Sequence, residues 1–257
     1  MPPLISLREC AVFLDFDGTL AEIAQRPSSV RVAPETHTIL RSVFETTNGS
    51  VAIVSGRPLA EIDTLLKPFI LSVAAVHGAS IRYPDGSIWH YSLPHGILPR
   101  LFKKAQKALG KYDGVIIENK GMAIAIHFRD RPELGPLCRA VARHIANSSP
   151  RLICQAGKMV IEIVPSDVGK GAAIRSLLQV PPFFGRRPIF AGDDLTDECG
   201  FDAVNAHGGI SIKIGGGETR AAYKLDDPGS LRQWLSILLN SANKDLVAGS
   251  LPRCRPN

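Results

Sequence analysis

The sequence is poor in cysteine and lacks the patterns in which cysteine usually supports a fold. Its 257 residues include five cysteines, which are scattered and form no C-x-x-C pair. An odd and dispersed set of thiols argues against a disulfide framework and against a zinc site. We therefore expect reduced thiols and a cytoplasmic protein.

Long apolar runs are missing as well. No run reaches the roughly 20 apolar residues that a membrane-spanning helix requires. The first ten residues, MPPLISLREC, lack the charged region and the long apolar region of a secretory signal. The sequence thus predicts no membrane partner, and its length suits one large or two small domains.

The charge pattern contains no basic stripe interleaved with aromatic residues. Thirty basic and 24 acidic residues leave a net charge of +6, and the basic residues are dispersed. The densest clusters, such as Lys103-Lys104 and Arg186-Arg187, are short. This pattern favours a solvated basic surface, so nucleic-acid binding is the least favoured alternative. The sequence does not determine the oligomeric state, and a monomer is the expectation.

Short apolar runs alternate with helical patterns along much of the chain. Residues at helical spacing follow a proline in 34–47 and 58–67, which is typical of amphipathic helices. This alternation predicts an α/β fold with a doubly wound parallel sheet. The predicted strands are 11–14, 51–54, 73–76, 188–191 and 209–214, and the other predicted helices are 169–178 and 228–239.

The middle of the chain breaks this alternation. Residues 81–88 read as a hairpin with an Asp85-Gly86 turn, and 93–166 read as helix, strand, strand, helix, strand, strand. Consecutive strands suit an antiparallel sheet, so we expect a small α+β domain at 93–166 inserted into a core of 1–92 and 167–257. The tail after Asn240 is rich in Ser, Asn and Pro and is predicted to fray.

The inserted strands each place polar and apolar side chains on opposite faces. Ile124, Ile126 and Phe128 share one face of 122–129, and Met159, Ile161 and Ile163 share one face of 158–164. The apolar face would receive the two helices. The polar face would stay open and present donors and acceptors, as a sugar ligand needs, although a plain solvated face is the alternative. Its residues are Glu118, Lys120, His127, Arg129, Lys158 and Glu162.

Two carboxylates follow the first predicted strand. Asp15 and Asp17 lie in LDFDGTL, where ligands of an open parallel sheet bind. Asp15 can be a nucleophile toward phosphorus and a Mg²⁺ ligand, and Asp17 can exchange a proton. Gly18 and Thr19 allow a sharp turn whose amides face phosphate. This D-x-D-G-T motif indicates phosphoryl transfer.

Three further motifs fit the same chemistry. Ser55-Gly56-Arg57 follows a predicted strand and could contact a phosphoryl group. Lys170 begins a predicted helix and could neutralise phosphate. Asp193 and Asp194 follow another strand and again suggest a hard metal ion.

This ordered set resembles the haloacid dehalogenase (HAD) superfamily of Mg²⁺-dependent phosphatases, whose C2-type cap occupies the position of the insertion. Within it, the chain resembles the trehalose-6-phosphate phosphatase family over nearly its whole length. The supporting residues are 14–20 (LDFDGTL), 54–57 (VSGR), 76–79 (VHGA), 118–121 (ENKG), 127–129 (HFR), 157–162 (GKMVIE), 170–174 (KGAAI) and 192–198 (GDDLTDE).

The resemblance implies hydrolysis of a sugar phosphate, with trehalose 6-phosphate as the expected substrate, through an aspartyl-phosphate on Asp15. Asp17 would be the general acid and base and a metal ligand, and Asp193 and Asp194 would complete the Mg²⁺ site. Ser55 and Lys170 would hold phosphate. The implied substrate contacts are Gly18, Thr19, Gly56, Arg57, His77, Glu118, Lys120, His127, Arg129, Lys158 and Glu162.

Two alternatives remain open at this point. The chain could be another sugar-phosphate phosphatase or a phosphomutase of the same superfamily. It could also be a catalytically silent sugar-phosphate sensor, although a sensor need not keep Asp15, Asp17, Lys170 and Asp193 together.

Overall fold

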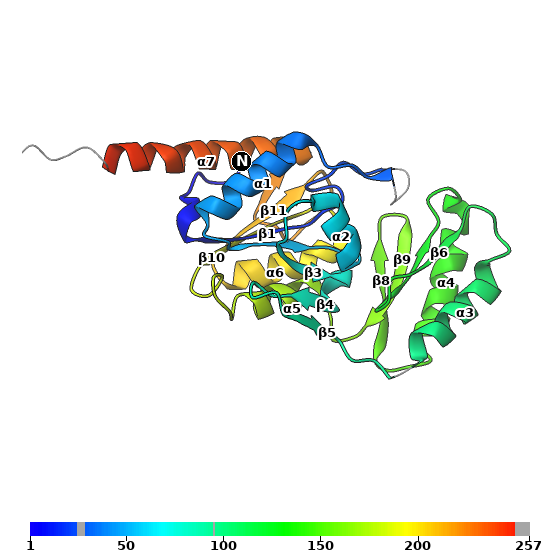
Figure 1. The fold of residues 1–257 in the computed structure, drawn as a ribbon. Helices are drawn as coiled ribbons and strands as arrows, with labels where there is room; N and C mark the ends of the chain where they lie inside the picture. Colours follow the sequence, from blue (N-terminus) through cyan, green and yellow to red (C-terminus); the bar gives the residue numbers. More distant parts are fainter. Residues whose placement is uncertain (25–28, 95, 250–257) are drawn as a thin grey trace, which may run out of the picture.

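The computed structural model describes residues 1–24, 29–94 and 96–249, with side chains through residue 241. These residues form two sheets, each covered by helices, and the second sheet stands beside the first (Figure 1). No helix in the described part of the chain is long and apolar enough to cross a bilayer.

The first sheet has eight strands in the order β12-β11-β10-β1-β2-β3-β4-β5. From β12 to β3 the strands are parallel, and β4 and β5 add an antiparallel hairpin at one edge, as the Asp85-Gly86 turn predicted. The strands are β1 (Cys10–Leu14), β2 (Val51–Val54), β3 (Ser72–Ala75), β4 (Ser80–Arg82), β5 (Ile88–His90), β10 (Arg187–Gly192), β11 (Ile210–Ile214) and β12 (Tyr223–Leu225).

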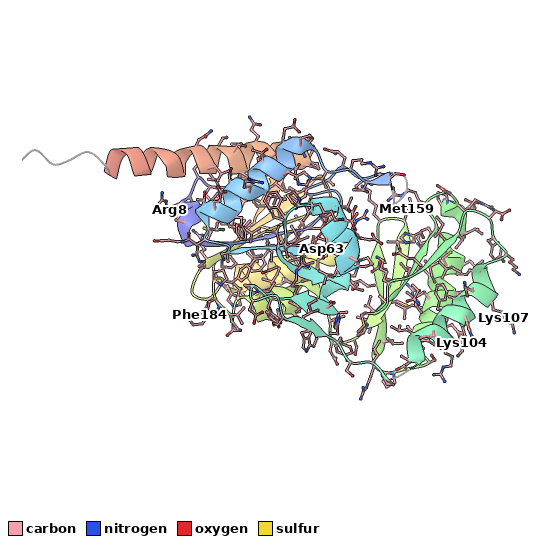
Figure 2. The ribbon with its side chains drawn as sticks, viewed as in Figure 1. Arg8, Asp63, Lys104, Lys107, Met159 and Phe184 are labelled. Carbon is pink, nitrogen blue, oxygen red and sulfur yellow. The ribbon has the colours of Figure 1, made fainter. Side chains whose placement is uncertain are left out.

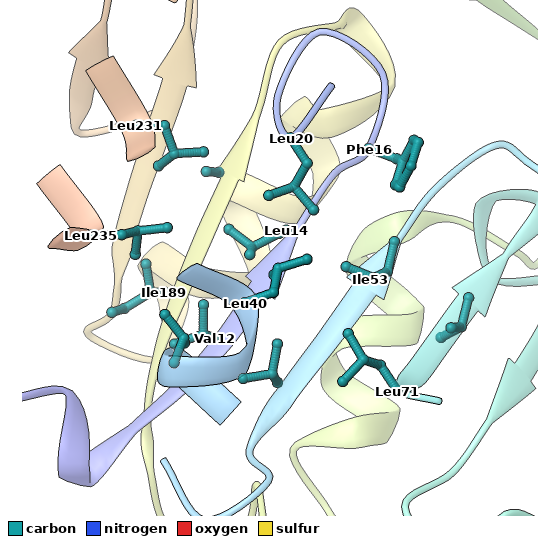
Figure 3. Packing of buried hydrophobic residues seen from close by; sticks show 14 of the residues in the cluster. Val12, Leu14, Phe16, Leu20, Leu40, Ile53, Leu71, Ile189, Leu231 and Leu235 are labelled. Atoms are coloured by element: carbon teal, nitrogen blue, oxygen red, sulfur yellow. The ribbon is translucent and has the colours of Figure 1, made fainter. Parts of the chain in front are cut away.

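Helices cover both faces of this sheet, which confirms the doubly wound α/β prediction. On one face, α1 (Pro34–Thr46), α2 (Leu59–Leu66) and α7 (Pro228–Gly249) pack on the strands, and Figure 3 shows Leu40 and Leu235 beside Val12 and Ile189. On the other face, α5 (Lys170–Leu177) and α6 (Glu198–Ala206) pack on a cluster of aromatic rings. That cluster includes Phe13, Phe183, Phe190 and Phe201. Burial on both faces explains why the central strands are apolar without alternation.

The second sheet has four antiparallel strands in the order β6-β7-β9-β8. They are β6 (Ile116–Asn119), β7 (Ile124–His127), β8 (Leu152–Gly157) and β9 (Val160–Pro165), and two helices, α3 (Ile97–Leu109) and α4 (Gly135–Ala146), cover one face. Ile124, Ile126, Ile161 and Ile163 are buried under these helices, as the alternation predicted. All these elements fall within 93–166, while the exact domain boundaries stay a prediction.

Two expectations are wrong. Met159 does not share the apolar face of Ile161 and Ile163: it has a φ of 63° in the β8–β9 turn and is 41% exposed. Figure 2 shows it at the end of the hairpin nearer the first sheet. The chain also does not fray after Asn240, because α7 continues to Gly249, through residues such as Ala242, Lys244 and Leu246 that favour helix. Residues 250–257 lie outside the described part.

Candidate active site

Asp15 lies at the carboxyl end of β1, beside the end of β10. Leu14 pairs with Ala191 in the parallel register, and the Asp15 amide donates to the Ala191 carbonyl at 2.9 Å. This register brings Asp15 close to Asp193, which follows Gly192 at the end of β10. Two motifs almost 180 residues apart in the sequence thus meet at one edge of the sheet, where α/β folds bind ligands.

Lys170 connects this edge to a third carboxylate. Its Nζ lies 2.7 Å from Asp15 Oδ1 and 2.6 Å from Asp197 Oδ1, and all three side chains are almost fully buried. Burial by itself lowers the pKa of Lys170, but the charges of Asp15 and Asp197 outweigh it and raise that pKa above its ordinary value. Lys170 therefore carries a permanent positive charge against Asp15.

Asp15, Asp193 and Asp197 offer oxygen atoms within 4.8 Å of one another. Burial raises the pKa of Asp15 well above its ordinary value, an effect that Lys170 opposes and Asp197 reinforces. Burial likewise raises the pKa of Asp193 to about 6, with the Asp197 charge adding to it. Buried carboxylates that crowd one another in this way suit a hard divalent cation, because the cation removes the repulsion.

The turn after β1 leaves room for this group only because Gly18 has no side chain. A Cβ at Gly18 would lie 2.3 Å from Asp193 Oδ2, and its φ of 81° disfavours other residues. The carboxylate oxygens and this close approach together fit the Mg²⁺ that the sequence predicted. Thr19, in the same turn, is fully buried. Gly18 and Thr19 do not line the cavity described below, so their substrate contacts stay a prediction.

The sequence did not predict Asp197 as a site residue, although the structure places it beside Lys170 and Asp15. Asp194, which was predicted as a metal ligand, makes other contacts. Asp197 is fully buried and accepts from the Asp194 amide at 2.9 Å as well as from Lys170. The Asp194 carboxylate instead accepts from the amides of Leu195 and Lys158. It lies outside the three-carboxylate group, and its role as a metal ligand stays a prediction. The D-x-x-D spacing, typical of a capped turn, was the available signal.

Asp17 is held by Arg57 rather than by Lys170. Arg57 Nε lies 2.6 Å from Asp17 Oδ2 and its Nη2 lies 2.8 Å from Oδ1, while Nη1 donates to Glu61 at 2.9 Å. Burial opposes the charge of Arg57, but its hydrogen bond with Asp17 and the two carboxylates raise its pKa. The Asp17 side chain is still 38% exposed, so solvent and a ligand can reach it.

Ser55 lies at the carboxyl end of β2 and is buried. Its hydroxyl accepts from the Arg57 amide at 3.2 Å, and its own amide donates to the Ala74 carbonyl. The hydroxyl is thereby oriented at the same sheet edge as Asp15, within one cavity that both residues line.

The polar face of the second sheet lines the other side of that cavity. Within the sheet, Lys120 Nζ lies 2.6 Å from Glu162 Oε1, and His127 Nε2 lies 2.8 Å from Glu118 Oε2. Arg129 donates to the Lys158 carbonyl at 3.4 Å. The six residues that the alternation placed on the open polar face all line the cavity.

Charge pairing dominates this side of the cavity. Burial opposes the charges of Glu162 and Lys120, yet the pKa of Glu162 is lowered by Lys120 and His77, and the pKa of Lys120 is raised by Glu162 and Glu118. Burial also opposes the charge of Glu118, but hydrogen bonding to His127 lowers its pKa. One side of the cavity is thus the sheet edge that carries Asp15, Asp193 and Lys170. The other side is a wall of paired polar side chains.

Sequence comparisons agree with this arrangement. The family model for trehalose-phosphatase matches residues 13–228. The chain is 39% identical over 228 residues to trehalose-6-phosphate phosphatase of Escherichia coli (strain K12), covering 89% of this chain and 86% of that protein. It is 40% identical over 206 residues to a probable trehalose-phosphate phosphatase of Sinorhizobium fredii, covering 80% and 77%.

Solved structures confirm the fold. The C-terminal domain of Candida albicans trehalose-6-phosphate phosphatase superposes with a TM-score of 0.81 at 21% identity, covering 91% of this chain and 92% of that one. A haloacid dehalogenase-like hydrolase from Bacillus subtilis superposes with a TM-score of 0.62 at 14% identity, covering 88% and 99%. The family-model match over most of the sequence, together with relatives near 40% identity, establishes that the chain belongs to the trehalose-phosphatase family.

Proposed function

We propose that this chain is a Mg²⁺-dependent phosphatase that hydrolyses trehalose 6-phosphate to trehalose and inorganic phosphate. The observation that carries the proposal is the contact of Asp15 with Lys170 inside a cavity whose opposite wall is polar. The choice of trehalose 6-phosphate as the substrate is supported by the relatives, which are named as trehalose-phosphatases. The same proposal makes the chain a cytoplasmic enzyme of trehalose biosynthesis.

The first step forms a covalent intermediate. Asp15 attacks phosphorus in line, so an Asp15–phosphorus bond forms as the bond from phosphorus to the sugar oxygen breaks. Asp17 gives its proton to that oxygen, and Lys170 and Ser55 contact the phosphoryl oxygens. Phosphoryl transfer depends mainly on positioning and on stabilising charge, which a fixed lysine and an oriented hydroxyl supply.

The second step releases phosphate. Water gives a proton to Asp17 and attacks the aspartyl-phosphate, so the Asp15–phosphorus bond breaks and Asp15 is regenerated. Asp15 and Asp193 would hold the metal ion, with Asp17 contributing its carbonyl and Asp194 or Asp197 supporting the site. When bound, Mg²⁺ supplies charge stabilisation for the transferring phosphoryl group.

The polar wall formed by the second sheet would select the substrate. A disaccharide presents many hydroxyl groups, and the cavity offers both donors and acceptors for them. We propose that Glu118, Lys120, Lys158 and Glu162 contact the glucose ring distal to the phosphate. Arg57, His77, His127 and Arg129 are expected to support these contacts.

A phosphate-release panel tests the function. Trehalose 6-phosphate is compared with glucose, sucrose and mannose phosphates, each with Mg²⁺ and with a chelator. We expect the highest kcat/KM for trehalose 6-phosphate and no turnover without the metal ion. A higher kcat/KM for another sugar phosphate would replace the substrate assignment, and binding of all of them without turnover would instead indicate a sensor.

A further inference from the structure

One peptide unit joins the two sides of the cavity. Lys120 belongs to the second sheet, and its Nζ donates to the carbonyl oxygen of Gly56 at 2.9 Å. The same peptide bond carries the amide of Arg57, which donates to Ser55 Oγ at 3.2 Å. The peptide between Gly56 and Arg57 is therefore fixed at its oxygen by Lys120 and uses its N–H to orient Ser55.

The Lys120 contact is buried and charged. The Lys120 side chain is 9% exposed, and that of its partner Glu162 is 6% exposed. A hydrogen bond from a charged donor in such surroundings is stronger than one between neutral groups. Lys120 uses two of its three N–H groups for Glu162 and Gly56, which leaves a third that can meet a substrate hydroxyl. Lys120 can therefore bind the Gly56 carbonyl and a sugar hydroxyl at the same time.

His77, which follows β3 of the first sheet, lies against Glu162, the partner of Lys120. Its Nε2 lies 2.5 Å from Glu162 Oε2, and its backbone amide donates to the Ser55 carbonyl at 2.9 Å. Val76 and His77 have positive φ values of 47° and 57°, and this conformation is costly above all for Val76, which is β-branched. The strained backbone turns the imidazole onto Gly56, where a Cβ would lie 2.6 Å from Nε2.

We propose that Lys120 is a positioning residue for the phosphate side of the cavity, through its bond to the Gly56 carbonyl. The proposal rests on the proposed phosphatase function and goes beyond sugar recognition. The sequence assigned Lys120 only to the sugar. The contact with Gly56 instead predicts that Lys120 orders the Ser55–Arg57 loop for any phosphate ester, including one that has no sugar.

An aryl phosphate separates these two roles, because p-nitrophenyl phosphate offers no sugar hydroxyl to Lys120. For Lys120→Met, we expect kcat with p-nitrophenyl phosphate and Mg²⁺ to fall roughly tenfold or more, since misplacing a reacting group by about 1 Å can cost up to about a hundredfold. The inhibition constant of inorganic phosphate should rise in the same variant. Loss of trehalose 6-phosphate turnover with unchanged aryl phosphate kinetics would overturn the proposal.

Lys120→Met alone leaves Glu162 buried with one cation fewer, which is destabilising. The double variant Lys120→Met/Glu162→Gln removes both charges and so keeps the test valid if the single variant unfolds. It should show the same loss with p-nitrophenyl phosphate while keeping its circular dichroism spectrum. A folded double variant with the wild-type rate would contradict the proposal.

Lys107→Met is the matched control. Lys107 lies on α3, is exposed and does not line the cavity, and Figure 2 shows it on the side of the second sheet that faces away from the first sheet. This variant should keep the wild-type kinetics for both substrates and for phosphate inhibition, and a loss equal to that of Lys120→Met would count against a specific role for Lys120. The wild-type panel judges the proposed function separately: if trehalose 6-phosphate is not a substrate, the aryl phosphate comparison still tests the Lys120 contact.

Discussion

Arg57 donates two parallel hydrogen bonds to the Asp17 carboxylate, from Nε to Oδ2 at 2.6 Å and from Nη2 to Oδ1 at 2.8 Å. The guanidinium is itself fixed by Glu61 and lies over the ring of Phe16. A planar fork of this kind holds a carboxylate in one orientation, which a lysine cannot reproduce. Arg57 therefore fixes the orientation of Asp17 within the cavity that both residues line.

Arg57→Lys is expected to lower kcat for trehalose 6-phosphate about tenfold, because Asp17, which we propose transfers the proton, loses its orientation. The loss should be smaller with p-nitrophenyl phosphate, whose leaving group needs little protonation. Steady-state kinetics with both substrates measure this. Arg82→Lys is a matched control, because Arg82 also donates two hydrogen bonds to one carboxylate, from Nη1 and Nη2 to Asp63, and lies outside the cavity. It should lower Tm and leave kcat unchanged; equal losses for both substrates in Arg57→Lys would argue against a role in protonation.

Asp15→Asn is expected to lower phosphate release by roughly a thousandfold or more, since an amide cannot serve as the nucleophile. The fold should persist, because the pKa of Asp15 is raised by burial and the folded protein already disfavours its charge. Circular dichroism and a phosphate-release assay check the two parts. Substantial turnover by a folded Asp15→Asn protein would remove Asp15 from the mechanism.

Mg²⁺ is expected to raise Tm more at about pH 7.5 than at about pH 5, because it binds deprotonated carboxylates. The sign follows from Asp193, whose pKa is raised from 3.8 to about 6. A carboxyl with a raised pKa in the folded protein destabilises the metal-free fold as pH rises from its ordinary pKa to the raised one, and the full penalty remains above that. Mg²⁺ offsets this penalty. Thermal unfolding with MgCl₂ or with KCl at equal ionic strength tests it, and an equal Mg²⁺ effect at both pH values would contradict it.

Asp197→Asn is expected to lower kcat about tenfold, because Lys170 loses one of its two buried carboxylate partners. It is also expected to weaken Mg²⁺ binding, because the group of Asp15, Asp193 and Asp197 loses one negative charge. Titration of activity with Mg²⁺ gives both quantities. Asp202→Asn is the control, since Asp202 is half-exposed and pairs with Arg220 outside the cavity. If the two variants behave alike, Asp197 has no special part in the site.

Local sequence patterns predicted most of the elements, although not α6 or β12, and predicted that the main motifs lie at one edge of the sheet. Apolar runs ending at Leu14 and Ala191 predicted parallel strands, and parallel strands present their carboxyl ends at one edge. The strand order then placed β1 beside β10, which brings Asp15 close to Asp193 within that edge. The same reasoning placed Ile124 and Ile126 under the helices, since alternation decides which face of a strand is buried.

The pairings between side chains were decided by the tertiary structure. Arg57 and Asp17 are 40 residues apart, and Lys120 and Gly56 are 64 residues apart, so no local period links them. Long polar side chains have many rotamers, and packing selects the one that satisfies a buried charge. That selection paired Asp197 with Lys170 and left Asp194 to cap a turn. Met159 lies outside the core for another reason, because it occupies the turn between β8 and β9. The sequence thus determined which residue types follow each strand. Only the folded chain decided which side chains pair with one another, because those pairs join residues that are far apart in the sequence.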